Sequence, residues 1–328
     1  MPPDRLRSIV PMFGGATQYV ETLDSVLEFV ESHHPTSDEL VGWHRGSFAN
    51  VTSRESILRR VSYLQQVGFL RQTDDRWMLG PAGREYVQQR DIDTLLQIMC
   101  DRNVGLRSLL YALSVGPMTI EAISDQQLDT HPELGWDPEQ TDMAKQRVNW
   151  LRSMGLLEQR DDAYALTAEG RQFVDGAVEQ WTDSDWTPSK GETGIHAGTY
   201  EVTVRARSID PEFRATVLSR YDRTCPVSGV DHPGLLDVAH VLPWSDYPEY
   251  RADLSNVLPL SKTHHAAFDR KLFTIDHDYR IRVNPDFETQ SDVLQRTIVD
   301  RAGERISLPT DSLDPEYVTR HNAALEWV

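Results

Sequence analysis

Cysteine is scarce in this sequence, and long hydrophobic runs are absent. The 328 residues include two cysteines, Cys100 and Cys225, which lie far apart in the chain. Two distant cysteines exclude a disulfide framework and a four-cysteine zinc site, and they fit a reducing compartment. No stretch approaches the roughly 18 apolar residues of a membrane span, and the first residues lack the apolar segment of a signal peptide. We therefore expect a soluble, cytoplasmic protein without a membrane partner.

Lysine is also scarce, in a chain that is strongly acidic. Acidic residues outnumber basic ones by 51 to 33, giving a formal net charge of −18, and only four of the basic residues are lysines. This composition is typical of proteins from salt-loving organisms, although an ordinary acidic cytosolic protein would also fit. An acidic surface repels polyanions at long range, but concentrated salt screens that repulsion within a few ångströms. The charge therefore does not exclude a nucleic-acid substrate.

The N-terminal half contains a repeat. The length suggests two or three domains, and residues 59–87 align without gaps to residues 146–174, an offset of 87. In each copy a helical pattern ends at a glycine, Gly68 or Gly155, as expected for a helix C-cap. A pair of aspartates then forms the turn between two short alternating stretches. Such regular repetition indicates two copies of one fold.

Each copy has the parts of a winged helix, namely three helices and a two-stranded hairpin. Apolar residues at helical spacing predict a helix from Tyr19 that Pro35 ends, a short helix after it, and a third from about Ser53 to Val67. Before them lies a segment punctuated by Pro and Gly without a clear period. The predicted units are an N-terminal arm, a first winged helix and a second winged helix, over residues 1–18, 19–90 and 91–178.

The third helix of each copy is basic. In a winged helix this helix can enter the major groove of DNA, where arginines contact phosphates and guanine edges. Winged helices also bind proteins, and exposed helix faces are usually charged, so both interpretations remain open. The first copy is the stronger candidate because its helix is richer in arginine. The candidate DNA-binding residues of these two helices are Arg54, Arg59, Arg60, Arg147 and Arg152.

The remaining chain begins with a change in composition. Residues 179–199 are polar, carry Gly, Pro, Ser and Thr, and have no apolar period, which predicts a linker. From Tyr200 the residues alternate as in a strand, and the following stretch predicts a helix that buries Phe213 and Val217. The last domain is therefore expected over residues 200–328.

The most informative stretch runs from Asp237 to Phe273. An apolar strand ends at His240, Asn256 follows 16 positions later in a loop, and His265 lies 9 positions further on, at the start of a short helix. This arrangement resembles the HNH nuclease motif, and most closely its restriction-type branch, with an acid-x-x-His-x-x-Pro strand and a His-x-x-Phe-Asp helix. The upstream pattern FR-x-x-VL-x-x-Y-x-x-x-C-x-x-x-G also resembles that branch.

The residue types in this stretch suit phosphodiester hydrolysis. That reaction needs an activated water, which an imidazole can supply, and charge stabilisation, which a divalent ion can supply. Asp237 and His240 are three positions apart on a strand and so point to different faces, which suits separate roles. His265 and Asp269 are four apart on one helix face, so both can reach one ion.

The resemblance implies a ββα-metal fold and a role for each matching residue. His240 becomes the general base, and Asn256 becomes the residue that orients it. Mg²⁺ is the ion expected of a carboxylate-rich shell, while Mn²⁺ or Zn²⁺ would suit the imidazole better; no structural zinc is expected. The implied metal ligands are Asp237, His265 and Asp269.

The sequence departs from the family pattern at two positions. Ala239 replaces a second metal ligand of the best-known HNH enzymes, and Lys271 stands where many members have glycine. Asp269 could instead form a structural ion pair with Arg270. His264 points away from His265 on a helix, so we expect it to face DNA or solvent. The candidate DNA-binding residues of this domain are His264, Arg270 and Lys271.

These expectations combine into one interpretation. The fold class is α+β and multidomain, with two winged helices followed by a ββα-metal nuclease domain. The function is a metal-dependent DNA endonuclease, with restriction of foreign DNA as its role and the winged helices as its DNA reader; a homodimer remains open. The alternatives are a winged-helix regulator that binds DNA or protein and carries an inactive HNH domain, and a nuclease that acts on RNA or branched DNA.

Overall fold

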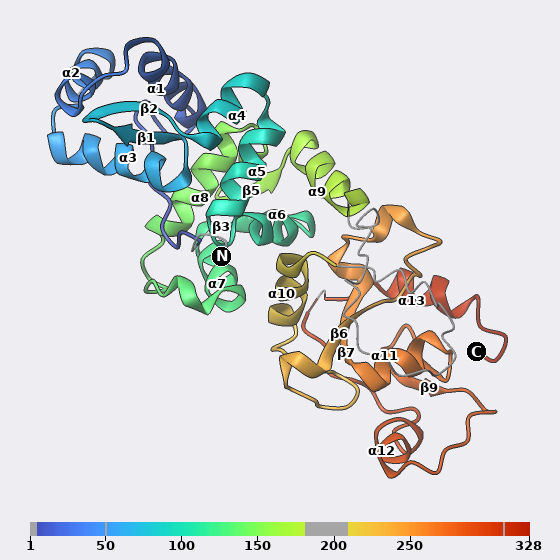
Figure 1. The fold of residues 1–328 in the computed structure, drawn as a ribbon. Helices are drawn as coiled ribbons and strands as arrows, with labels where there is room; N and C mark the ends of the chain where they lie inside the picture. The colour runs from blue at the N-terminus through green and yellow to red at the C-terminus, as the bar shows by residue number, and fades with distance from the viewer. Residues whose placement is uncertain (1–4, 50, 181–208, 311) are drawn as a thin grey trace, which may run out of the picture.

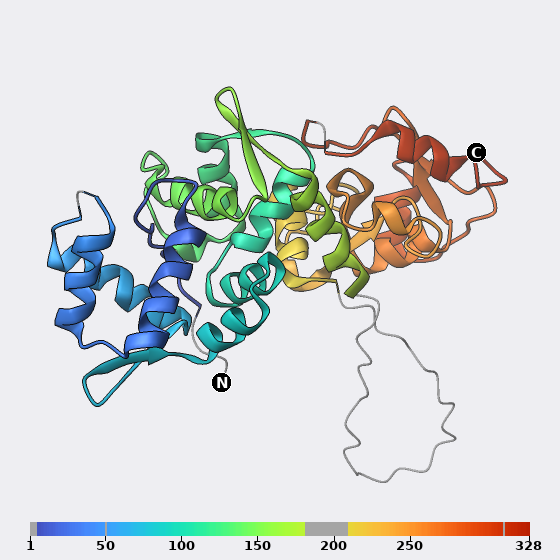
Figure 2. The same ribbon diagram turned by 90° about the horizontal axis from the view of Figure 1, so that it is seen from above.

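Two helical units and a C-terminal α+β domain follow one another along the molecule (Figure 1), and a view from above shows the same order (Figure 2). The computed structural model describes residues 5–49, 51–180, 209–310 and 312–328. In that part of the chain, no helix is long and apolar enough to cross a membrane. The sheets are small and antiparallel.

The first unit has the predicted order of three helices and a hairpin. Its first helix buries Leu23, Val26, Leu27 and Val30, which are the apolar positions of the predicted period. The hairpin turn has a positive φ at both central aspartates, as a two-residue type I′ turn requires. The elements are α1 (Tyr19–His33), α2 (Ser37–Ser47), α3 (Arg54–Val67), β1 (Leu70–Thr73), β2 (Arg76–Leu79) and α4 (Pro81–Gln89).

The second unit repeats this order from α6 onward, and it adds a helix, α5, before it and a short strand within it. Gly68 and Gly155 adopt φ of 100° and 76°, so both end their helices in the predicted left-handed conformation. A short strand joins the second hairpin and makes a three-stranded sheet in the order β3-β5-β4. The elements are α5 (Ile92–Arg102), α6 (Leu106–Ser114), β3 (Met118–Thr119), α7 (Ile120–Thr130), η1 (Pro132–Leu134), α8 (Asp142–Ser153), β4 (Leu157–Arg160), β5 (Ala163–Leu166) and α9 (Ala168–Gln180).

The segment before α1 packs against both units. Ile9, Val10 and Met12 are buried, although no period in the sequence predicted a buried face there. The indole N–H of Trp150 on α8 donates to the Val10 carbonyl at 2.9 Å. The same indole meets the ring of Tyr19 on α1 edge-on, with 5.5 Å between centroids. The arm and α8 therefore tie the second unit to the first.

Arg147 belongs to this packed region, so its prediction as a DNA contact is wrong. Its side chain is fully buried, and burial lowers the pKa of its guanidinium to about 10, which still leaves it charged at neutral pH. One terminal nitrogen donates to the carbonyls of Arg7 at 2.7 Å and Val104 at 3.2 Å. The guanidinium also lies over the ring of Trp136 at 4.7 Å. Helix α8 is thus turned inward at this position.

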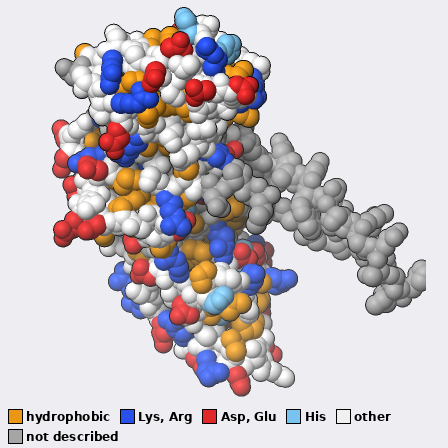
Figure 3. Space-filling model, turned by 60° about the vertical axis from the view of Figure 1, so that its left-hand side comes forward, with side chains coloured by type: hydrophobic (Ala, Val, Ile, Leu, Met, Phe, Trp, Pro, Cys, Tyr) orange, Lys and Arg blue, Asp and Glu red, His pale blue; other side chains and the backbone are white. Residues whose placement is uncertain are grey.

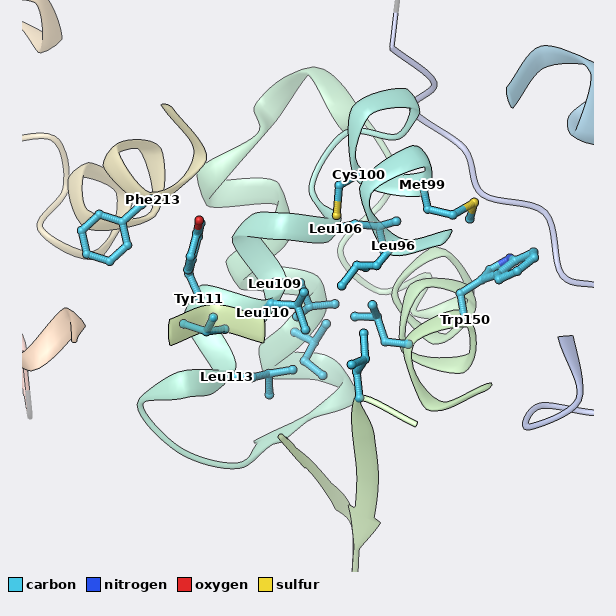
Figure 4. Close-up of a cluster of buried hydrophobic side chains, with 14 of the residues drawn as sticks. Leu96, Met99, Cys100, Leu106, Leu109, Leu110, Tyr111, Leu113, Trp150 and Phe213 are labelled. Atoms are coloured by element: carbon cyan, nitrogen blue, oxygen red, sulfur yellow. The ribbon is translucent and has the colours of Figure 1, made fainter. Parts of the chain in front are cut away.

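Helix α10 (Pro211–Arg220) connects the second unit to the C-terminal domain. Its Phe213 is fully buried and meets Tyr111 of α6 edge-on, with ring centroids 5.4 Å apart. These two side chains point toward one another beside the leucines of α6 (Figure 4). Val217 and Leu218 are also buried, in agreement with the predicted helix. One apolar cluster therefore continues from the second unit into the C-terminal domain.

Acidic residues at the start of α10 strengthen this junction. The Asp210 carboxylate lies 2.9 Å from Arg107 of α6. Glu212 accepts a hydrogen bond from the backbone N–H of Ser108 at 2.8 Å and pairs with Arg5 of the arm. Both carboxylates are buried in these contacts, where an unpaired charge would be costly. The C-terminal domain is therefore held to the arm and to α6 by polar as well as apolar contacts.

The C-terminal domain has the predicted strand that ends at His240 and the predicted helix that carries His265, and a hairpin and a closing helix follow them. Part of the linker predicted over 179–199, and the strand predicted from Tyr200, lie outside the described residues. The first 3-10 turns and strands position the site, and the last helix closes the domain. The elements are η2 (Pro233–Leu235), β6 (Leu236–His240), η3 (Pro248–Tyr250), η4 (Leu254–Asn256), β7 (Val257–Ser261), α11 (Lys262–Asp269), β8 (Phe273–Ile275), β9 (Ile281–Val283), α12 (Asp292–Leu294), the π-helical turn η5 (Gln295–Val299) and α13 (Pro315–Asn322).

Candidate functional site

His240 is the last residue of β6, a strand whose apolar residues are buried against β7. In this antiparallel pair His240 stands opposite Val257, and its side chain is only partly covered. Ring atom Nε2 lies 2.9 Å from the carbonyl oxygen of Arg251. Because a carbonyl only accepts, Nε2 carries the proton in the neutral ring and the lone pair is on Nδ1. This is the tautomer that a general base with Nδ1 as its acceptor atom requires.

Asn256 organises the loop that follows His240. Its side chain is fully buried at the end of η4. The amide oxygen accepts from the backbone N–H of Leu242 at 2.8 Å, and the amide nitrogen donates to the carbonyls of Tyr250 at 3.0 Å and Leu242 at 3.4 Å. The amide thus bonds to the backbone on both sides of the loop. Its influence on the His240 ring passes through this loop, which also carries Arg251.

Helix α11 brings His265 between two carboxylates. Nδ1 of His265 lies 3.6 Å from Asp237 on β6, and Nε2 lies 3.5 Å from Asp269, four residues on. The sequence placed all three residues at one site, and they are neighbours. They do not surround one point, however, because the two ring nitrogens point in different directions. Among the described residues, no group of three His, Cys, Asp or Glu side chains is placed to hold a metal ion.

His265 makes contacts of similar length with the two carboxylates, 3.6 Å to Asp237 and 3.5 Å to Asp269, so either side of the ring could hold an ion. Two ligands at ~2.1 Å from one ion lie about 3 Å apart, so the 3.6 Å between Nδ1 of His265 and Asp237 needs only a small closure. Asp269 then contacts the other ring nitrogen. Metal-bound histidines commonly donate that second N–H to a carboxylate, which fixes the ring. An ion held by Asp237 and His265 would therefore leave Asp269 in the position of a residue that orients His265.

His264 is not where the sequence analysis expected it. Its side chain is 1% exposed, so the prediction that it faces DNA or solvent is wrong. One ring nitrogen lies 2.7 Å from the hydroxyl of Ser261, and the other lies 2.8 Å from that of Thr297. Burial lowers the pKa of His264, so the ring stays neutral. The residue joins α11 to η5, a segment that the sequence did not place beside it.

Arg270 and Lys271 are exposed at the end of α11. Arg270 donates to the Ala266 carbonyl, while Asp269 approaches His265, so the alternative of an Asp269–Arg270 ion pair is not seen among the described residues. Lys271 has a φ of 57°, in the left-handed region that favours glycine. That conformation explains why the family pattern has glycine at this position.

The basic residues predicted in the first helical unit differ in their surroundings. Arg59 is exposed, whereas Arg54 is exposed but paired with Asp38 at 2.6 Å. Arg60 is half-buried, and its guanidinium lies 3.9 Å from the ring centroid of Phe13 in the arm. On the face shown in Figure 3, blue and red side chains alternate without forming a continuous basic patch.

Arg152, the other candidate on α8, is half-buried near Tyr164. Its guanidinium lies 5.7 Å from the centroid of that ring, which belongs to β5 of the second hairpin. The candidates of the second unit are therefore a buried arginine and a half-buried one. We retain Arg54 and Arg59 of α3 as the accessible candidates for a contact with DNA.

The comparison with protein families matches the same part of the chain. Residues 225–276 match the family described as HNH endonuclease. The match begins at Cys225, which is fully buried, includes β6, β7 and α11, and ends with Asp276 after β8. No curated protein matches the chain. The C-terminal part of the chain therefore carries an HNH endonuclease domain.

Two residues of the site were not predicted from the sequence. Arg251 acts through its carbonyl oxygen, an atom that every residue has, so no residue type marks it. The second is Trp244, whose ring lies edge-on to the His240 ring, with 5.0 Å between the centroids. The sequence offers one signal for these contacts, namely that Trp244 and Arg251 lie in the loop between His240 and Asn256.

The buried amide of Asn256 predicts a measurable effect on stability. In Asn256→Ala the backbone groups of Leu242 and Tyr250 lose their partners, so we expect the free energy of unfolding to fall by roughly 2 kcal/mol. Urea denaturation followed by circular dichroism measures this change. Ser245→Ala, an exposed change in the same loop, should leave the unfolding curve within about 0.5 kcal/mol of the parent. Equal stability of the two variants would contradict the role given to Asn256.

Proposed function

We propose that the protein is a metal-dependent DNA endonuclease of the restriction type. The observation that carries the proposal is His240, whose tautomer is set by the Arg251 carbonyl, within residues matched by the HNH endonuclease family and on the strand that also carries Asp237. An HNH domain implies DNA as the substrate. Restriction of foreign DNA is the role that its resemblance to the restriction-type branch favours.

The hydrolysis begins with His240. With its proton on Nε2, the ring accepts a proton from water at Nδ1 and so produces the nucleophile that attacks phosphorus. The resulting imidazolium has two N–H groups, and the Arg251 carbonyl continues to accept from Nε2. The buried amide of Asn256 keeps that carbonyl in place during the proton transfer. The chain's own contribution is therefore a positioned base in a loop of fixed shape.

Asp237 and His265 would hold the divalent ion, with Asp269 orienting the His265 ring. When bound, the ion would stabilise negative charge on the phosphate and on the leaving 3′ oxygen. A carboxylate and an imidazole are both acceptable donors to Mg²⁺, Mn²⁺ or Zn²⁺, and Mg²⁺ is our first choice for hydrolysis of DNA. The exposure of both donors leaves the ion open to water and substrate.

A second candidate is a DNA- or protein-binding regulator with an inactive HNH domain. The observation that favours it is the absence, among the described residues, of three side chains grouped around a metal position. Retention of the base, its carbonyl acceptor and the Asp237–His265 pair favours the enzyme instead. Cleavage of plasmid DNA after addition of Mg²⁺ or Mn²⁺ separates the two functions.

We also propose that the two helical units are winged helices and that the first reads DNA through α3. The order of helices and hairpin supports the fold, and the exposure of Arg59 supports the contact. In the second unit the corresponding helix is packed against α1 through Trp150. The first unit therefore offers the more accessible surface for a DNA groove.

The general base gives the most direct test. His240→Ala removes an imidazole that contributes roughly 10²–10⁴ in rate, and we expect plasmid cleavage to fall by that factor while DNA affinity changes little. Single-turnover digestion in Mg²⁺ and in Mn²⁺ across several salt concentrations measures the rate. Cleavage at the parent rate would exclude His240 as the base.

The metal assignment predicts different effects for two neighbours. His265→Ala removes a ligand, while Asp269→Asn removes only its orienting partner, so we expect the latter to weaken metal affinity about 10–100-fold and the former to weaken it more. Isothermal titration with Mn²⁺ measures both. Asp286→Asn, an exposed change after β9, should match the parent. Unchanged affinity in His265→Ala would remove it from the metal site.

Two arginines of the helical units should behave in opposite ways. Arg59→Ala should weaken DNA binding and lower the salt slope by about one, because one exposed charge is lost, while the unfolding curve is retained. Arg147→Ala should lower the free energy of unfolding by about 3 kcal/mol, because buried carbonyls and Trp136 lose their partner. Anisotropy with labelled duplex and urea denaturation measure the two effects. If Arg59→Ala binds as the parent does, α3 is not the reading helix.

A further inference from the structure

A cluster of aromatic and arginine side chains adjoins His240 outside the predicted metal site. It comprises Trp244, Tyr247, Tyr250 and Arg251 from the loop between β6 and β7, together with Tyr317 and Arg320 from α13. Resting on the proposed nuclease function, we propose that Arg320, held on Tyr247 and Tyr250, binds a phosphate of the DNA strand that flanks the bond to be cut. This contact would fix the register of the strand relative to His240.

The loop part of the cluster is joined directly to the base. The Arg251 carbonyl accepts from His240, and the side chain of the same residue turns back, with its Nε–H donating to the Trp244 carbonyl at 2.9 Å. Its guanidinium lies 5.1 Å from the Trp244 ring centroid, and that ring is edge-on to His240. A ligand that shifts this loop would therefore also shift the His240 ring.

Arg320 reaches this loop from a helix about 70 residues further along the chain. Its guanidinium lies 4.9 Å from the ring centroid of Tyr247 and 5.5 Å from that of Tyr250, and it donates to the Tyr250 hydroxyl at 3.5 Å. The hydrogen bond with Tyr250 raises the pKa of Arg320, so the side chain stays charged. Aromatic stacking holds an arginine in place while its N–H groups remain open to a ligand.

The tyrosines are themselves held. Tyr317 packs on Tyr250 with 4.9 Å between ring centroids, and its hydroxyl donates to Asp253 at 2.7 Å. That carboxylate also accepts from the backbone N–H of Ser255. Asp253 therefore accepts from two donors. The rings of Tyr247 and Tyr250, on which Arg320 rests, are called the tyrosine shelf here, and Tyr317 and Asp253 hold its Tyr250 side in place.

The charges in this region favour a phosphate as the ligand. The chain has a net charge of −18, so carboxylates outnumber the arginines that they could pair with. Among the ion pairs of the described residues, none involves Arg251 or Arg320. A fixed, charged guanidinium without a carboxylate is suited to bind phosphate oxygens through two parallel N–H groups. Arg320 packs on the same loop whose Trp244 and Arg251 contact His240, and this shared loop makes the substrate strand the source of that phosphate.

The test is DNA affinity in Arg320→Ala, measured in EDTA so that no strand is cut. We expect a dissociation constant raised about five- to tenfold at 0.1 M salt, with the difference fading toward 1 M, because one phosphate contact lowers the salt slope by about 0.9. Arg320→Lys keeps the charge and should retain the parent slope. Arg296→Ala removes an exposed arginine of η5, which directly follows α12, and this variant should bind as the parent does.

Three results would overturn the proposal. One is an Arg320→Ala salt slope equal to that of Arg296→Ala. Another is an equal loss in Arg320→Lys and Arg320→Ala, which would assign the effect to packing on the tyrosines. The third is a salt-independent loss of DNA affinity in Tyr247→Leu without a loss in Arg320→Ala. That result would mean that the tyrosines stack on nucleobases of the DNA. A parent chain that binds with the expected slope but never cuts with Mg²⁺ or Mn²⁺ would instead contradict the nuclease function and leave the phosphate contact standing.

Discussion

The hydrogen bonds of one buried amide, Asn256, fix the loop on which the candidate site depends. They join the start of the loop at Leu242 to its later part at Tyr250. The loop between Leu242 and Asn256 carries Trp244 and Arg251, both of which contact His240. Because an unpaired buried amide is costly, this arrangement is strongly preferred over alternatives with a different loop path. The position of the base is thus determined by a residue that need not touch substrate.

The N-terminal units show how burial changes the meaning of a basic residue. The repeat aligns Arg147 on α8 with Arg60 on α3, yet Arg147 is enclosed by backbone carbonyls, whereas Arg60 is half-buried and Arg59 beside it is exposed. The arm is responsible for much of this difference, because its carbonyls face α8 and its Phe13 covers Arg60 on α3. Charge on a helix face therefore indicates a nucleic-acid surface only where no other segment covers that face.

Most elements could be predicted because their signals are local. The period of α1, the glycine caps and the aspartate turns follow from backbone preferences of a few neighbouring residues. The same holds for β6 and α11, where spacing brought Asp237, His265 and Asp269 to one place. The contacts that could not be predicted join distant segments or use backbone atoms. His264 is buried beside Thr297 of η5, a segment more than 30 residues away, so no local pattern predicts its burial. Arg251 acts through its backbone carbonyl, so no residue type predicts its role.

Helix α10 belongs to two cores at once, since Phe213 packs on Tyr111 of the second unit while the rest of the helix supports β6 and β7. Asp210 and Glu212 add charged contacts to α6 and to the arm. An HNH domain attached in this way does not swing freely from the helical units. If α3 reads the DNA, the bond that is cut lies at a set number of base pairs from the bound sequence, as on a ruler. The products would then share one defined end rather than a spread of lengths.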